Sequence, residues 1–135
     1  KIEGAIGRDP ANRKKMSVVE KGGKSALTHY RVIRAIGTRA SLIECRLSTG
    51  RTHQIRVHMA RLGHSIVGDP VYGMRIARQL KGAAIGDVKL IQGLNYQLLH
   101  AFHIGFIHPR SGQKLNFRSE NYNNINSVIK ILEII

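Results

Sequence analysis

The chain has 135 residues, enough for one compact domain and too few for two comfortable ones. Its 22 Lys and Arg against eight Asp and Glu give a formal net charge of +14, which predicts a polyanionic partner such as nucleic acid. The basic residues are scattered along the chain, which argues against membrane binding, and nothing in it resembles a signal peptide or an apolar membrane span.

Strand-like segments bounded by turn residues fill the first part of the chain, at 1–6, 15–20, 26–37 and 40–48. In the last segment Ile43, Cys45 and Leu47 alternate with charged residues, which predicts a half-buried strand. Gly22 and Gly23 predict a hairpin turn between the second and third segments. A single cysteine excludes an internal disulfide, and it favours a reducing cytoplasm.

A helix is predicted after Gly50, because Ile55, Met59 and Leu62 form an apolar stripe at helical spacing. Thr52 is a candidate N-terminal cap, and Gly63 is a natural C-terminal stop. The polar residues of this helix are expected to face solvent or a ligand. They are Gln54, Arg56, His58 and Arg61.

The rest of the chain predicts three further elements. Residues 74–93 suggest a short helix followed by a mobile loop. Phe102, Ile104 and Phe106 share one face of a strand that forms a second hairpin with residues 114–118 through an R-S-G turn. Residues 125–132 carry the apolar pattern of a terminal helix. Together the elements predict an α+β fold with largely antiparallel strands.

The stretch STGRTHQIR, residues 48–56, has the features of an anion-binding site. A helix N-terminus offers free N–H groups and a partial positive charge, and Arg56 can bind a carboxylate or phosphate bidentately. Such a site either contacts an RNA backbone or positions a catalytic carboxylate supplied from elsewhere. The only acidic residue nearby is Asp69, whose position before Pro70 predicts a turn in which the carboxylate caps its own backbone.

Metal chemistry finds no support in the histidines. His53 and His58 are five residues apart, so they do not share a helix face as a zinc-binding pair does, and no Glu lies between them. No zinc or other metal site is therefore expected.

Residues 49–73, TGRTHQIRVHMARLGHSIVGDPVYG, resemble the central motif of the RluA/RluD-type RNA pseudouridine synthases. The segments GRDPANRKKMSV, GKSALTHYRV, LIECRLSTG and LLHAFHIGFIHPRSGQKLNF are similar to those that flank this motif in the large-subunit ribosomal RNA synthase of the group. The resemblance covers residues 1 to about 120. Residues 121–135, the Asn-rich tail and its helix, carry none.

The resemblance implies the C-terminal part of one pseudouridine-synthase catalytic domain, with a mixed, largely antiparallel sheet and flanking helices. It implies that the intact protein isomerises uridine to pseudouridine in large-subunit ribosomal RNA in the cytoplasm, without cofactor or metal. In the family an aspartate in an H-R-L-D-x-x-T-S-G motif drives this reaction. That motif is not in this sequence, so the chain alone is expected to be inactive.

Residue roles follow from the same resemblance. Arg56 matches the motif arginine that pairs with the catalytic aspartate and keeps it ionised. Four residues shortly before it match positions that order the site and contact RNA, and two leucines of the LLHA segment match an apolar segment packed close to the pocket. These residues are Arg51, Thr52, His53 and Gln54, then Leu98 and Leu99.

Two further expectations stay open. The chain could instead be a basic RNA-binding module that uses the same surface without chemistry. If it is part of a larger domain, unpaired strand edges and exposed apolar surface predict self-association.

Overall fold

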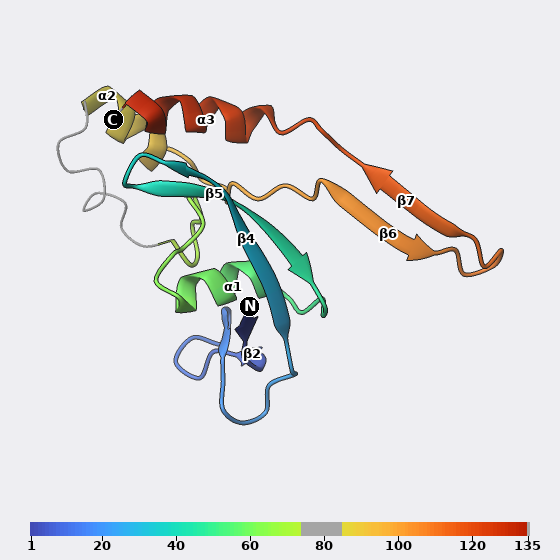
Figure 1. Ribbon diagram of the computed structural model, residues 1–135. Helices are drawn as coiled ribbons and strands as arrows, with labels where there is room; N and C mark the ends of the chain where they lie inside the picture. The colour runs from blue at the N-terminus through green and yellow to red at the C-terminus, as the bar shows by residue number, and fades with distance from the viewer. Residues whose placement is uncertain (74–84, 135) are drawn as a thin grey trace.

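The computed structural model describes residues 1–73 and 85–134. Its elements, in chain order, are β1 (Ile2–Glu3), β2 (Ile6–Arg8), β3 (Met16–Val18), β4 (Leu27–Ile36), β5 (Ala40–Leu47), α1 (Gln54–Arg61), α2 (Ile85–Gln92), β6 (His103–Ile107), β7 (Lys114–Arg118) and α3 (Asn123–Ile134). Every strand pairing among them is antiparallel, which confirms the predicted α+β class (Figure 1). No helix in the described part is long and apolar enough to cross a membrane.

The long hairpin of β4 and β5 is the central element of the fold. Gly37 turns it with φ of 54°, and β1 adds a third strand along the start of β4. The predicted alternation in β5 is wrong, because Leu47 is 49% exposed whereas Leu42, on the opposite face, packs against a core cluster. That face is covered because the helices near the tip of the hairpin lie over it.

The predicted hairpin around Gly22 and Gly23 is also wrong. β3 pairs with β2, whereas β4 pairs with β1 and β5, so the two strands beside this turn belong to different sheets. Gly22 has φ of 74°, which lets the chain turn, and Lys24 then bridges to Ile6 on the open edge of β2. The turn therefore leads the chain from the two-stranded β2–β3 sheet to the three-stranded β1–β4–β5 sheet.

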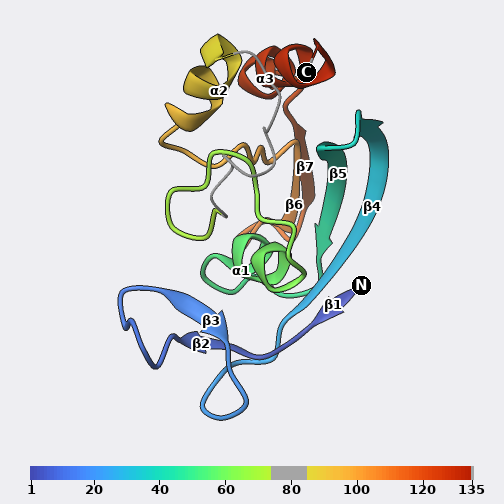
Figure 2. The same ribbon diagram turned by 90° about the vertical axis from the view of Figure 1, so that its left-hand side faces the viewer.

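Two separate apolar clusters hold the sheets and helices together. Figure 2 shows the elements that they join, with α1 beside β2 and β3, and with α2 and α3 near the tip of the β4–β5 hairpin. One lies between α1 and the β2–β3 pair and contains Ile6, Ala26 and Val57. The other packs α2 and α3 against the tip of the β4–β5 hairpin, with Ile36 and Ile91 at its centre. The terminal helix predicted from residues 125–132 is confirmed, since its apolar residues face this second cluster.

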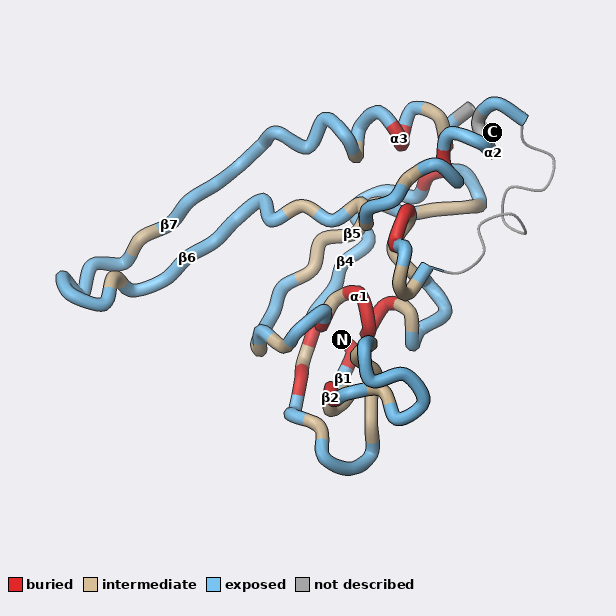
Figure 3. The backbone as a smooth tube through the Cα atoms, turned by 180° about the vertical axis from the view of Figure 1, so that it is seen from behind, coloured by how far each residue is buried: buried red, intermediate tan, exposed pale blue. Residues whose placement is uncertain are grey.

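The hairpin of β6 and β7 projects away from both clusters, and Gly112 makes the predicted turn with φ of 69° (Figure 1). Every residue of β6 is exposed (Figure 3). Phe106 of β6 stacks on Phe117 of β7, with ring centroids 6.0 Å apart. Among residues 1–73 and 85–134, this hairpin has no apolar cover beyond its own side chains.

The prediction for residues 74–93 falls partly outside the described residues. The part within them contains α2, whose Ile91 is buried in the second cluster.

Candidate functional site

Helix α1 begins in an unusual way. Its N-terminal cap is His53, with φ of 56° and ψ of 23°, a left-handed conformation that costs about 1–2 kcal/mol for a non-glycine residue. The hydroxyl group of Tyr72 lies 3.0 Å from Nδ1 of this histidine and fixes its ring. Thr52 is exposed and is not the cap, so that prediction is wrong.

The other end of α1 follows the prediction. Gly63, with φ of 80°, donates its N–H to the carbonyl of Ala60, and His64 donates to that of Met59. These two bonds form the glycine-terminated motif that satisfies the last carbonyls of a helix.

Gln54 belongs to the framework of the site. It is 2% exposed, and its carbonyl oxygen accepts hydrogen bonds from the hydroxyl of Thr49 at 2.8 Å and the N–H of Arg51 at 2.9 Å. Its amide nitrogen donates to the carbonyl of Leu27 and the hydroxyl of Thr28, both at 3.0 Å. Because both ends of the amide are occupied by these bonds, Gln54 is not available for the RNA contact that was expected of it.

His58 shows the same departure from the prediction. It was expected to face solvent or a ligand, but it is fully buried, with Nδ1 2.9 Å from the hydroxyl of Thr28 and Nε2 3.3 Å from the carbonyl of Gly4. The expected apolar stripe ends at Leu62, which is 41% exposed. α1 therefore buries polar side chains that bond to the neighbouring strands.

Arg56 has a partner within the chain. Its Nε donates to Oδ2 of Asp69 at 2.8 Å and its Nη2 donates to Oδ1 at 2.9 Å, a bidentate pair with side chains 11% and 0% exposed. Oδ1 also accepts the N–H groups of Val71 and Tyr72, both at 2.9 Å. The predicted turn at Asp69 is thus present. Asp69 is a partner of Arg56 that the sequence did not predict, but it is not the motif aspartate of the family, so the pairing of Arg56 with that aspartate stays a prediction.

Electrostatics keep this pair ionised. Burial raises the pKa of the Asp69 carboxyl, but the hydrogen bonds from Arg56, Tyr72 and Val71 and the guanidinium charge outweigh it, so the pKa lies below its ordinary value. The hydrogen bond to Asp69 raises the pKa of Arg56 further, against the effect of burial.

Tyr72 connects the pair to the rest of the site. Its ring lies 4.9 Å from Cζ of Arg56, a cation–π contact, and its hydroxyl accepts the N–H of Met16 at 2.9 Å as well as contacting His53. Burial first, and then the charge of Arg56, lower the pKa of His53, which favours its neutral form. Sequence reasoning did not single out Tyr72, although it stands three residues after Asp69 in the same turn.

The accessible part of the site lies at the start of α1. Arg51 is half-buried and anchors its Nε to the carbonyl of Ser25 at 3.0 Å, while Thr52 and His53 are exposed. Three of the four residues expected to contact RNA are therefore accessible together. No three metal-binding side chains lie together in the described part of the chain.

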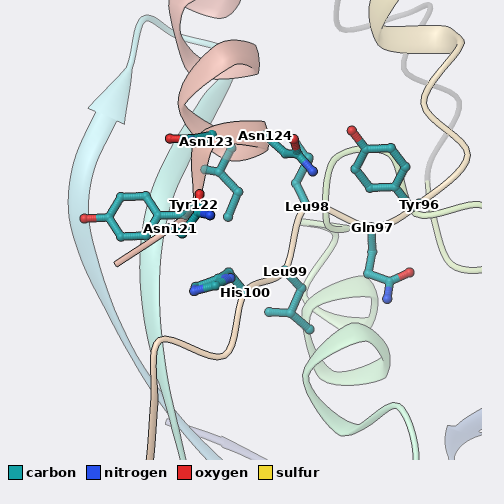
Figure 4. A pocket seen from close by; sticks show the side chains of 10 residues that line it. Tyr96, Gln97, Leu98, Leu99, His100, Asn121, Tyr122, Asn123 and Asn124 are labelled. Carbon is teal, nitrogen blue, oxygen red and sulfur yellow. The ribbon is translucent and has the colours of Figure 1, made fainter. Parts of the chain in front are cut away.

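Leu98 and Leu99 lie apart from this cluster, beside a cavity of about 380 Å³ (Figure 4). The N–H of Leu98 bonds to the carbonyl of Val67 at 2.9 Å, which ties the LLHA segment to the turn containing Asp69. His100 and Tyr122 also line the cavity, with rings 5.9 Å apart, as do two asparagines at the start of α3 and one just before it. The cavity is thus lined by both polar and apolar side chains.

Comparisons with known proteins agree with this architecture. The family model described as RNA pseudouridylate synthase matches residues 1–61. "Ribosomal large subunit pseudouridine synthase D" of Zymomonas mobilis is 47% identical over 98% of this chain and 40% of its own length, and its namesake in Neisseria meningitidis serogroup B is 45% identical over 99% and 35%.

A solved structure has the same fold. The chain matches "Human RNA Pseudouridylate Synthase Domain Containing 1" with a TM-score of 0.69 and 25% identity, over 94% of this chain and 51% of the human one. The chain spans only 35–40% of the length of the two bacterial relatives. With one sequence family and one fold common to all these matches, the chain belongs to the family of RNA pseudouridylate synthases.

Proposed function

We propose that this chain is the C-terminal part of a catalytic domain that isomerises uridine to pseudouridine in large-subunit ribosomal RNA. The relatives carry that activity and substrate in their names, and the net charge of +14 suits a polyanionic substrate. Action in the cytoplasm, without metal or cofactor, is part of the proposal.

One observation carries the catalytic role. The guanidinium of Arg56 is buried, charged and fixed in orientation by Asp69 and the ring of Tyr72. A buried cation that is already oriented stabilises an anionic group beside it without the cost of reorganisation. Arg56 therefore holds a catalytic aspartate ionised, and that aspartate comes from a part of the protein beyond this chain.

Substrate contacts belong to the accessible start of α1. Arg51, Thr52 and His53 bind the RNA near the target uridine, while Gln54 shapes their backbone. Leu98 and Leu99 supply apolar surface on the other side of the Asp69 turn.

A tritium-release assay tests the proposal. A ribosomal RNA transcript labelled at C5 of uridine should release tritium with the complete protein and none with this chain alone, because the chain holds the arginine without the aspartate. Release by the chain alone would contradict this assignment of roles, and no release by the complete protein would contradict the activity.

A non-catalytic RNA-binding module is the second candidate. The pairing of Arg56 with Asp69 favours it, since a guanidinium already paired within the chain needs no further carboxylate. Such a module would bind RNA with steep salt dependence, a slope of about −0.7 per phosphate contact for a single strand, and would leave every uridine unchanged. The tritium assay separates the two candidates.

Self-association is proposed for the isolated chain. Apart from the half-buried Leu115, the aromatic and aliphatic side chains of β6 and β7 are exposed, and so are the middle residues of β4. Exposed apolar surface of this kind promotes association. Light scattering should show dimers or larger species, and a clean monomer would contradict this proposal.

A further inference from the structure

The guanidinium of Arg56 has two usable edges, and the structure occupies only one of them. Nε and Nη2 form the inner edge and are bonded to the two oxygens of Asp69. A guanidinium has five N–H donors, so Nη1 and the second N–H of Nη2 form an outer edge that can receive another carboxylate. Nη1 has no acceptor among the described residues, and the Arg56 side chain is 11% exposed.

Asp69 is itself held firmly. Its carboxylate accepts hydrogen bonds from two backbone N–H groups of the following turn, and its backbone carbonyl accepts one from the N–H of Gly73 at 3.0 Å. Gly68, with φ of 76°, lies so close to the carbonyl of Tyr96 that a Cβ there would overlap it. The carboxylate thus stays in place without Arg56, and it dictates where the arginine points.

The face of the guanidinium is fixed by a second contact. The Tyr72 ring lies against it at 4.9 Å, and the hydroxyl of that ring is bonded to β3 and to the start of α1. Asp69 holds one edge of the Arg56 guanidinium and Tyr72 holds one face. The orientation of the group is therefore fixed, and so is the direction in which its outer edge points. A catalytic step that depends on orientation loses about 100-fold in rate for a misplacement of roughly 1 Å.

We propose that Asp69 is a positioning residue that aims the outer edge of Arg56 at the catalytic carboxylate. This inference rests on the proposed function and deepens it. Asp69 acts only through Arg56 and touches neither RNA nor the reacting atoms.

The test uses the complete protein and measures kcat and KM by tritium release for wild type, Asp69→Asn, Arg56→Met and the double variant. Asn keeps an oxygen for the turn but places an amide N–H against a guanidinium N–H, so the pair loses a contact and its charge partner. We expect kcat of Asp69→Asn to fall about 100-fold with KM within about twofold of wild type. In the Arg56→Met background the same substitution should leave kcat unchanged within twofold.

The matched control is Asp9→Asn. Asp9 also precedes a proline, and its Oδ1 also accepts two backbone N–H groups, from Ala11 and Asn12 at 2.9 Å, but no arginine pairs with it in the described structure. The kcat of the Asp9→Asn variant should equal that of wild type. A purely structural effect of losing an Asp-Pro turn would appear in both variants.

Arg56→Lys provides a second variant in case Asp69→Asn does not fold. Lysine keeps the charge and can bond Asp69, but it has no second edge, so kcat should fall while the thermal midpoint stays within a few degrees of wild type. In addition, the Nε–H signal of Arg56 in nitrogen-15 NMR should be slow to exchange in wild type and fast in Asp69→Asn.

The outcomes separate the two proposals. Two outcomes would overturn the positioning role while the activity stands. One is a wild-type kcat in Asp69→Asn. The other is a loss of kcat in the double variant that equals the product of the losses in Asp69→Asn and Arg56→Met. A complete protein that releases no tritium would overturn the proposed function and this inference with it, even if the NMR signal shows that Asp69 holds Arg56.

Discussion

Two turns of this molecule share a dipeptide and a hydrogen-bond pattern but differ in everything around them. Asp9-Pro10 and Asp69-Pro70 each use an aspartate oxygen to accept the N–H groups two and three residues later, all at 2.9 Å. The first turn joins β2 to β3 in solvent. In the second turn the carboxylate of Asp69 is buried and also binds Arg56 of α1.

The difference shows which part of the site is local. An Asp-Pro sequence is sufficient for the turn, because its hydrogen bonds span three residues. The ion pair spans 13 residues and depends on α1 and on the chain path through Gly68. The same side chain is therefore a solvent-exposed turn former in one place and the support of a buried cation in the other.

The largest effect is expected from removing the cation of the buried turn. Arg56→Met leaves the carboxylate of Asp69 unpaired and should lower the free energy of unfolding by about 3–5 kcal/mol. Arg8→Met, beside the exposed turn, should change it by less than about 0.5 kcal/mol. Urea denaturation followed by circular dichroism measures both. Equal losses would mean that the burial of the pair has no energetic weight.

The residue before the buried turn gives the next effect. Gly68→Ala combines a positive φ with overlap on the Tyr96 carbonyl and should cost about 3 kcal/mol or more. Gly37→Ala has a positive φ but open space around it and should cost about 1 kcal/mol. Thermal midpoints of the two variants provide the comparison, and a harmless Gly68→Ala would show that the chain path there can relax.

The two aspartates can be compared directly. Asp69→Asn should lower the free energy of unfolding by about 1–3 kcal/mol, because a charged bidentate pair is replaced by a poorer contact. Asp9→Asn should be within about 0.5 kcal/mol of wild type, since Asn forms the same turn. Matched denaturation curves decide this, and similar losses would mean that the turn rather than the pair is what matters.

The acid limb of stability should depend on the buried carboxylate. The pKa of Asp69 is lower in the folded protein than in the unfolded chain, where it is about 3.9. Its contribution is therefore fully present above about pH 4 and is lost as the pH falls through the lower, folded pKa. The gap in stability between wild type and Asp69→Asn should be constant from pH 7 to about 5 and narrow below about 4. A gap that widens on acidification would contradict the direction of the shift.

The smallest effect concerns the last residue of the Asp69 turn, Tyr72. Tyr72→Phe loses the hydroxyl contacts to Met16 and His53 and should cost about 1 kcal/mol. Tyr122→Phe is the control, because its hydroxyl makes no hydrogen bond among the described residues, and it should be neutral. Thermal denaturation measures both, and equal midpoints would show that the hydroxyl of Tyr72 contributes nothing to stability.

Sequence patterns predicted the features that arise within a few residues. The β6–β7 hairpin, the terminal helix, the glycine stop of α1 and the turn at Asp69 all follow from local periodicity or turn chemistry. The burial of the polar face of α1 could not be predicted in this way. Gln54 and His58 are buried because acceptors in β4 and at Gly4, 26 to 54 residues away, bond to them. The hydropathy pattern of the helix does not reveal those acceptors.

Arg56 illustrates the same limit at the site itself. Its chemistry predicted a bound carboxylate or phosphate, and the structure contains a carboxylate. Asp69 was the only acidic residue nearby, but its position before Pro70 predicted only a turn, so the local sequence did not indicate the ion pair. The left-handed conformation of His53 was not predicted either, and the hydroxyl that contacts its ring belongs to a residue 19 positions away.

The hydroxyl of Tyr72 joins three segments at one atom: β3, 56 residues earlier in the chain, the start of α1, 19 residues earlier, and the turn of Tyr72 itself. Bringing together points that far apart costs loop entropy before any contact repays it. We therefore expect this junction to form late in folding and to open early under partial denaturation, so that a nascent chain acquires its helices before it acquires a usable arginine.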